Sequence, residues 1–246
     1  MTVLTGKVAL VTGGSGAIGS AICRVAAKNG AKVAFTYHRN SDGAASLLEE
    51  LRAISGAHLS AELNYDDFSA IEGFAERVEA ELGGIDALVN NLGITQVMPF
   101  ALIEEDDWDQ MIEVNLKSMF FFTKAAVRRM IRRRCGAVIN MSSAAGHRIL
   151  EVPVHYATAK AAVMGFTTSL AGEMKRYGIR VNAVAPGLVE GGIGQNISPR
   201  QLEEYNRFCA TGRPGTPEEI AELVVFLASP LASYLNGQTI FIDGGI

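Results

Sequence analysis

Apolar and polar residues alternate in two rhythms along this chain. Short runs rich in Val, Ile and Ala indicate strands, and longer segments with apolar residues at three- and four-residue steps indicate helices. The expected strands span residues 7–11, 32–37, 58–63, 87–89, 137–141, 179–184 and 239–242. The expected helices span about 17–29, 43–54, 68–82, 105–134, 154–177 and 217–228, and the stretch 186–213 is loop-rich.

The regular alternation of strands and helices predicts an α/β fold. Seven strands separated by helices imply a doubly wound parallel sheet that is covered by helices on both faces. The chain has 246 residues, of which 48% are hydrophobic, so it can bury one large core. No linker, repeat or low-complexity segment divides it, and we therefore expect a single domain over residues 1–246.

The composition argues against several classes of partner. A net charge of −4 disfavours general binding to nucleic acid or to a membrane surface. Cys23, Cys135 and Cys209 are widely spaced and odd in number, which favours reduced thiols over disulfides or a metal site. No apolar run approaches the length of about eighteen residues that a membrane helix needs, and the first strand begins too early for a signal peptide. We expect a cytoplasmic protein.

The first candidate site is the start of the helix near Val154. Tyr156 and Lys160 are four residues apart, so they lie on one face of that helix, one turn from each other. An ammonium beside a phenol stabilises the phenolate, and lowering the pKa of a tyrosine from ~10 to about 7 takes roughly 4 kcal/mol. Taken alone, the same spacing also fits an ordinary amphipathic helix.

The second candidate site is the glycine-rich turn Thr12–Gly19. Gly14, Gly16 and Gly19 match the pattern G-x-G-x-x-G, directly after a predicted strand and before a predicted helix. In that context glycines let the backbone approach a pyrophosphate, whose charge is met by the free N–H groups of the helix. The turn therefore predicts a dinucleotide site.

Together, T-G-x-x-x-G-I-G from Thr12 and Y-x-x-x-K from Tyr156 resemble the short-chain dehydrogenase/reductase family in its compact single-domain form. The resemblance implies a Rossmann-type fold and an NAD(P)-dependent oxidoreductase. In the family's register Gly13 and Gly19 match, whereas Ala17 replaces the middle glycine and Gly16 stands beside it.

Further motifs extend this resemblance over residues from about 6 to 245. It implies catalytic roles for Ser143, thirteen residues before Tyr156, and for Asn115, which in the family distorts its helix and holds a proton-relay water. Ser142 is expected to support the turn. In the N-N-L-G sequence, Leu92 replaces an alanine beside the cofactor. The resemblance implies that the cofactor-binding residues are Gly13, Ser15, Gly16, Ile18, Gly19, Arg39, Asn64, Tyr65, Asn91, Gly93, Tyr156, Lys160, Pro186, Gly187 and Val189.

The end of the second strand indicates which dinucleotide binds. An acidic residue there holds the ribose of NAD, whereas a basic residue accommodates the 2′-phosphate of NADP. Arg39 occupies this region and no acidic residue follows until Asp42, which favours NADP(H) over NAD(H). Against this, Gly16 stands where NADP-dependent members often carry a basic residue.

The reaction implied by the resemblance is hydride transfer from NADPH to a ketone. Tyr156 would donate the proton, Ser143 would polarise the carbonyl, and Lys160 would lower the pKa of Tyr156 and hold the nicotinamide ribose. Within the family, the chain is most similar to reductases of β-ketoacyl thioesters, linked to acyl carrier protein or to CoA. The alternatives are an alcohol or sugar dehydrogenase that works oxidatively with NAD(P), and a non-catalytic nucleotide-sensing member.

Three further expectations concern the substrate and partners. We expect a substrate lid at about residues 188–208, and His147, Arg148, Ile149, Leu150 and His155 near the pocket mouth, as rim or packing residues. Five arginines within seven residues should repel one another, and Arg134 matches a family arginine that docks acyl carrier protein, with Lys175 and Arg176 nearby. The apolar surplus of the helices at 105–134 and 154–177 predicts a homotetramer, or at least a dimer.

Overall fold

A single parallel sheet organises the molecule. The computed structural model describes residues 2–148, 150–192 and 197–246. Its seven strands follow the order β3-β2-β1-β4-β5-β6-β7, and every neighbouring pair is parallel, as the sequence predicted. The strands are β1 (Val8–Val11), β2 (Lys32–Tyr37), β3 (Leu59–Glu62), β4 (Ala87–Asn90), β5 (Gly136–Met141), β6 (Ile179–Pro186) and β7 (Thr239–Ile242).

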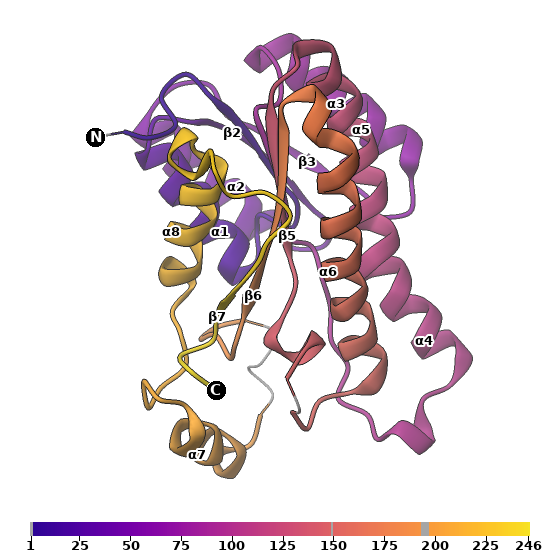
Figure 1. The fold of residues 1–246 in the computed structure, drawn as a ribbon. Coiled ribbons are helices and arrows are strands. Elements are labelled where there is room, and N and C mark those ends of the chain that lie inside the picture. The colour runs from indigo at the N-terminus through magenta and orange to yellow at the C-terminus, as the bar shows by residue number, and fades with distance from the viewer. Residues whose placement is uncertain (1, 149, 193–196) are drawn as a thin grey trace.

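Helices cover both faces of this sheet. One layer contains α1, α2 and α8, and the opposite layer contains α3, α5 and α6 (Figure 1). The helices are α1 (Ala17–Lys28), α2 (Ser41–Ile54), α3 (Phe68–Leu82), α4 (Glu105–Ile112), α5 (Ser118–Arg133), α6 (Val154–Met174), α7 (Pro199–Phe208) and α8 (Pro217–Ala228). Each layer encloses its own apolar cluster against the sheet, which explains why the strands read as almost continuous apolar runs.

The order of the strands determines where a ligand can bind. The chain adds β2 and β3 on one side of β1, and then returns to add β4 and the later strands on the other side. The loops after β1 and β4 therefore separate at their carboxyl ends, which is where open α/β sheets bind ligands. The loop after β5 and the first turn of α6 lie at this same end of the molecule (Figure 1).

The helix expected over 105–134 is interrupted. A single π-helical turn, Glu113–Lys117, separates α4 from α5. Asn115 lies in this turn, and its Nδ2 donates to the backbone oxygen of Met111 at 3.0 Å and to that of Ile94 at 3.1 Å. Such turns commonly occur at functional sites. The distortion agrees with the one that the family resemblance implied for this asparagine.

The stretch expected to be loop-rich contains a helix that was not predicted. Helix α7 begins at Pro199, and Ser198 and Gln201 form a reciprocal capping box at its start. The apolar residues of α7 recur at three-residue steps, as Leu202, Tyr205 and Phe208, so both this helical spacing and the capping pattern were present in the sequence. Residues 193–196 of the expected lid lie outside the described residues.

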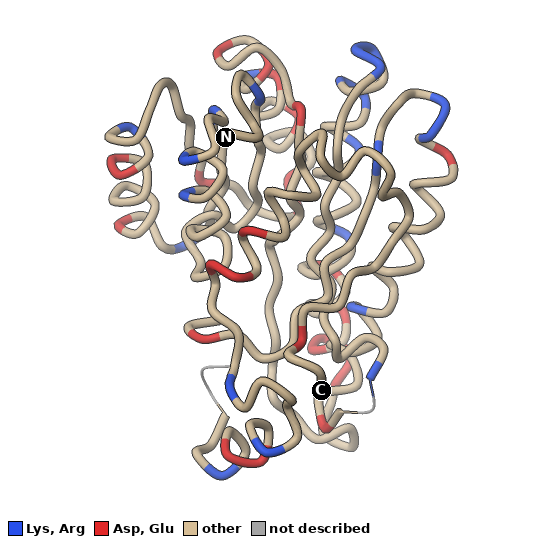
Figure 2. Tube along the Cα trace, turned by 60° about the vertical axis from the view of Figure 1, so that its left-hand side comes forward, with Lys and Arg blue, Asp and Glu red and all other residues tan. Residues whose placement is uncertain are grey.

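Charged residues of both signs are interspersed along the chain (Figure 2). The described helices include none that is long and apolar enough to cross a bilayer.

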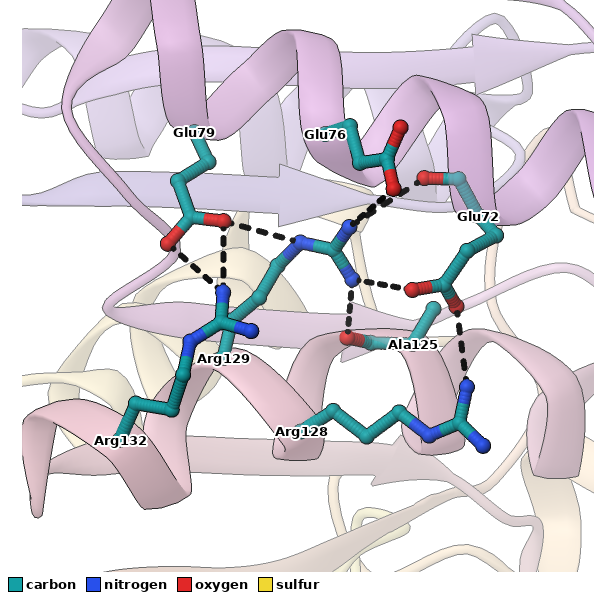
Figure 3. A network of polar contacts seen from close by, with 7 residues as sticks. All are labelled: Glu72, Glu76, Glu79, Ala125, Arg128, Arg129 and Arg132. Atoms are coloured by element: carbon teal, nitrogen blue, oxygen red, sulfur yellow. Dashed lines mark hydrogen bonds and ion pairs between the residues drawn. The ribbon is translucent and has the colours of Figure 1, made fainter.

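The expectation that five crowded arginines repel one another is wrong for four of them. Arg129 is buried at 3% exposure, and its guanidinium meets three glutamates of α3 (Figure 3). Arg128 and Arg132 pair with Glu72 and Glu79 of the same helix, while Arg133 pairs with Asp86. These carboxylates lie far away in sequence, and the packing of α3 against α5 brings them to the arginines. Arg134 instead donates to the backbone oxygen of Arg176 at 2.9 Å.

Candidate active site

Helix α6 positions the tyrosine and lysine together. It begins at Val154, as predicted, and Lys160 lies one turn after Tyr156 with only 4% of its surface exposed. The Lys160 Nζ donates to the backbone oxygen of Met141 at 3.1 Å and lies 5.7 Å from the centre of the Tyr156 ring. The ammonium is therefore held between α6 and the end of β5.

The two serines after β5 have different environments. Ser142 is buried, and its hydroxyl donates to the backbone oxygen of Lys160 at 2.7 Å, so it supports the turn as expected. Ser143 is partly exposed, and its Oγ accepts a hydrogen bond from the N–H of Ala145 at 3.2 Å. That bond uses the Ser143 oxygen as an acceptor, so the hydroxyl proton points to another partner, and the neighbouring Tyr156 hydroxyl is within its reach.

The electrostatics of the site differ from the expectation in one respect. Burial raises the pKa of Tyr156, and hydrogen bonding to Ser143 opposes this only in part. Burial also lowers the pKa of Lys160 to about 8. The pKa of Tyr156 therefore lies above its ordinary value, whereas the sequence predicted that Lys160 would lower it. The phenol is protonated at neutral pH.

Asn115 fixes the loop that follows β4. Its Oδ1 accepts a hydrogen bond from the N–H of Ile94 at 3.2 Å, while its Nδ2 donates to Ile94 and Met111. A Cβ added at Gly93 would lie 2.8 Å from Asn115 Oδ1 and 3.2 Å from Lys160 Nζ. Only a residue without a side chain fits between these two groups. The side chain of Asn115 is thus occupied by backbone partners, so a relay water would need another atom, such as a carbonyl freed by the π turn.

The turn between β1 and α1 fits a dinucleotide pyrophosphate. Gly13 has a φ of +67°, and a Cβ added at Gly14 would meet Phe35 at 2.6 Å. The helix starts at an N-cap glycine, Gly16, which offers no side chain to its first N–H groups. An open backbone beside an uncapped helix start provides donors for an anion. Ser15, Ala17 and Ile18 flank this opening and are partly exposed.

Thr12 was not among the predicted site residues, although it precedes the glycine turn. Its Oγ1 accepts hydrogen bonds from the N–H groups of Asn91 and Leu92, both at 3.0 Å. In return, the Asn91 Nδ2 donates to the backbone oxygens of Thr12 and Gly13. These bonds join the ends of β1 and β4 across the point where the sheet order reverses. The side chain of Asn91 therefore shapes the glycine turn.

Residues expected near the adenosine gather around a small pocket. His38, Leu63, Tyr65 and Leu92 line it, and the His38 and Tyr65 rings meet edge to face with centres 6.3 Å apart. Asn64 is exposed beside this pocket. Arg39 is also exposed, and it pairs with no carboxylate among the described residues.

The segment after β6 is held by the C-terminal part of the chain. The Gly187 N–H donates to the backbone oxygen of Ile242, and a Cβ at Gly187 would lie 2.9 Å from the Asp243 Cα. Pro186 and Val189 are buried on either side. The glycine is thus explained by close backbone packing, whatever its relation to a cofactor.

A buried network of polar side chains joins β4 and β5 to α5 and α6 next to the site. Asn90 donates to Thr123 of α5 and to Asn140 of β5, each at 2.8 Å, and Asn140 donates to Thr167 of α6 at 2.9 Å. This hydrogen-bond network was not predicted. The available signal was an asparagine near the end of each of two expected strands, which becomes informative only once the strands pair with Asn90 opposite Asn140.

The residues expected at the pocket mouth divide into two groups. His147 and Arg148 are exposed, and Arg148 pairs with Asp243 at 3.3 Å. His155 is fully buried, so it packs in the interior and does not line a rim. Its two ring nitrogens have no hydrogen-bond partner in the described structure, and burial lowers its pKa. Ile149 lies outside the described residues.

Comparisons with known proteins agree with this geometry. A family model described as enoyl-(acyl carrier protein) reductase matches residues 13–246. A 3-oxoacyl-[acyl-carrier-protein] reductase of Vibrio harveyi is 39% identical over 243 residues, which are 99% of this chain and 98% of that protein.

Solved structures are similar over almost the whole chain. A short-chain dehydrogenase/reductase from Serratia marcescens has a TM-score of 0.92 and 33% identity, covering 99% of this chain and 98% of its own. A gluconate 5-dehydrogenase from Burkholderia cenocepacia, in complex with NADP and tartrate, has the same TM-score and identity, covering 98% of this chain and 95% of its own. With the glycine turn and the Ser143, Tyr156 and Lys160 arrangement, these matches show that the chain is an oxidoreductase of the short-chain dehydrogenase/reductase family.

Proposed function

We propose that this enzyme uses NADPH to reduce the ketone of a β-ketoacyl thioester to a secondary alcohol. The observation that carries the proposal is the Tyr156 phenol beside the Ser143 hydroxyl, with the buried ammonium of Lys160 5.7 Å from the tyrosine ring. Reduction of a ketone needs a proton donor at the developing oxyanion, and a phenol beside a hydroxyl can serve as that donor. The 3-oxoacyl-[acyl-carrier-protein] reductase among the relatives supports the substrate class.

The residues of the chain then have defined tasks. A bound NADPH would supply the hydride to the carbonyl carbon. Tyr156 donates its proton to the oxygen, while the Ser143 hydroxyl holds and polarises that oxygen. Lys160 holds the nicotinamide ribose, and Asn115 fixes the loop at Gly93 so that Lys160 keeps its place. A pKa of about 8 leaves Lys160 largely charged at neutral pH, as this role requires.

Steady-state rates test the reaction. We expect turnover with NADPH on β-ketoacyl thioesters, and little on simple ketones or sugars. Tyr156→Phe should bind NADPH normally and lose nearly all turnover, because the ring remains while the proton donor is removed. Wild-type turnover in that variant would refute the acid role. The second candidate function is a sugar or alcohol dehydrogenase, which is supported by the similarity to a gluconate 5-dehydrogenase. Faster oxidation of a polyol with NAD(P) than reduction of any ketone would favour this second function.

The preference for NADPH is proposed from Arg39. Its guanidinium is exposed at the end of β2, and the next residue, Asn40, uses its side chain to cap α2 and to contact the backbone of Ser15. No acidic side chain takes the position that would hold the ribose of NAD. Arg39→Ala should raise the KM for NADPH about tenfold and leave that for NADH unchanged. Arg52→Ala, at an exposed position of α2, is the control.

Docking of an acyl carrier protein is proposed at the exposed basic residues Arg134, Lys175 and Arg176. Because carboxylates neutralise the other four arginines of the cluster, the basic surface is smaller than the sequence indicated. Arg134→Glu should raise the KM for a carrier-bound substrate several-fold, more at low salt, and should not change turnover of a small thioester analogue. Equal effects on both substrates would remove the docking proposal.

We also propose that a second copy of the chain covers the groove between α5 and α6, as part of a homotetramer or at least a dimer. The groove has a volume of about 340 Å³ and an exposed aromatic residue, Phe120, at 44%. The residues that line it are Phe120, Thr123, Lys124, Val127, Arg128, Ile131, Phe166, Ser169, Leu170, Glu173 and Met174. Sedimentation should show an oligomer that Phe166→Glu dissociates. A wild-type monomer at micromolar concentration would contradict the assembly.

A further inference from the structure

The hydroxyl of Tyr205 connects three separate parts of the chain. Tyr205 lies on α7, and its Oη accepts a hydrogen bond from the N–H of Leu188 at 3.0 Å. The same hydroxyl donates to the backbone oxygen of Asp243 at 3.3 Å. Burial raises the pKa of Tyr205, so the proton needed for the second bond stays in place. One side chain thus joins α7 both to the segment that follows β6 and to the turn that follows β7.

The backbone packs closely around this hydroxyl. A Cβ added at Gly187 would lie 2.6 Å from the Tyr205 Oη and 3.1 Å from the Asp243 oxygen. The Gly187 N–H donates to Ile242, while the N–H of Thr211 donates to the oxygen of Gly244 at 3.1 Å. Bonds therefore run from both sides of Tyr205 to the same C-terminal turn.

The C-terminal turn also reaches the loop that carries Ser143. The Asp243 carboxylate is only 8% exposed and pairs with Arg148, five residues after Ser143. The Arg148 guanidinium lies 5.0 Å above the ring of Phe241, which fixes it from a second direction. The other oxygen of the Asp243 carboxylate accepts a hydrogen bond from the Gly245 N–H at 3.0 Å. Thus the position of α7 is tied, through Asp243, to the loop of Ser143.

We propose that Tyr205 is a positioning residue for the substrate. In this view its hydroxyl and the Asp243–Arg148 pair set α7 at a fixed place relative to Ser143 and to the backbone at Leu188. Figure 1 places α7 beyond the carboxyl ends of β6 and β7, at the same end of the molecule as the first turn of α6. A ketone bound between Ser143 and α7 would then find its binding surface already assembled. The catalytic part of this inference rests on the proposed ketoreductase function.

Hydrogen exchange tests the anchoring without any assumption about the reaction. Tyr205→Phe removes one hydroxyl and keeps the ring, so we expect amide exchange over residues 199–208 to become about tenfold faster. Tyr234→Phe is the matched control, since that side chain is fully exposed at 102%, and it should exchange like the wild type. Unchanged exchange in Tyr205→Phe would overturn the proposal, whether or not the enzyme reduces ketones.

Kinetics test the positioning role. Tyr205→Phe should raise the KM for the ketone about fivefold, while kcat and the Kd for NADPH stay within about twofold. A fall in kcat with an unchanged KM would overturn the role. If the wild-type enzyme reduces no ketone, the proposed function fails, but the exchange result still decides the anchoring.

A second variant tests the link to Arg148. Asp243→Asn keeps an oxygen for the Gly245 N–H but weakens the pair with Arg148. Because both substitutions loosen the same turn, the KM of the double variant should rise by less than the product of the two single effects. Independent, multiplicative effects would show that Tyr205 and Asp243 do not act through a common turn.

Discussion

Replacing Lys160 by methionine should remove activity and make the fold more stable. Lys160 is 4% exposed, and burial lowers its pKa to about 8 from an ordinary value of ~10.4. At roughly 1.4 kcal/mol per pKa unit, the folded state bears a cost of about 3 kcal/mol for keeping this side chain charged. Methionine fills a similar volume without charge, but it leaves the Met141 carbonyl without its donor, at a cost of about 1 kcal/mol. Lys160→Met should therefore gain about 2 kcal/mol at pH 7.

The pH dependence distinguishes this explanation from better packing. Below pH 8 the lysine is protonated in both states, so the whole cost is present. Between pH 8 and about 10.4 the unfolded chain binds more protons than the folded one, and the stability of the wild type rises with pH. The advantage of Lys160→Met should therefore shrink across this range and disappear near pH 10.

Urea unfolding followed by circular dichroism, at matched protein concentration, measures the difference at pH 7 and at pH 10. Lys28→Met, at an exposed position of α1, is the control and should shift stability by less than about 0.5 kcal/mol at both pH values. A Lys160→Met variant that is less stable than the wild type at pH 7, or an advantage that does not change with pH, would refute the reasoning.

Other perturbations have equally specific outcomes. Gly93→Ala should reduce kcat/KM about tenfold with the fold retained, because its Cβ would press on Lys160 Nζ at 3.2 Å; unchanged kinetics would show that the lysine can move freely. Arg129→Met should cost about 2 kcal/mol in urea unfolding, since it removes the buried guanidinium that joins Glu72 and Glu79 and leaves them only the exposed Arg128 and Arg132, whereas Arg134→Met should cost almost nothing. Burial lowers the pKa of His58 below 6.5, so the unfolded chain binds a proton more tightly than the folded one, and stability falls as the pH drops from about 6.5. His58→Asn should reduce this loss of stability, measured as the change in the urea midpoint between pH 7 and pH 5. An equal loss in the variant and the wild type would show that other groups cause it.

The local pattern of the sequence determined the fold and the core of the site. Strand and helix positions follow from hydrophobic periodicity, which depends on each segment having one face to bury. The glycine turn and the Tyr156–Lys160 spacing are equally local, because a turn needs a permissive backbone and a helix places residues four apart on one face. These features were therefore readable before any tertiary contact was known, and the structure confirms the seven-stranded parallel sheet and the start of α6 that they predicted.

Only the tertiary structure decided how charged and buried groups behave. Four arginines of α5 form ion pairs with carboxylates that lie dozens of residues away in the sequence. Burial raises the pKa of Tyr156, whereas the sequence predicted a lowered pKa. The position of α7 likewise depends on a hydroxyl that meets backbone from two other segments. Burial and long-range pairing are properties of packed elements, and electrostatic energies in particular depend on how much water remains around each group. Spacing along the chain specifies which groups are neighbours on one helix, but not what surrounds them.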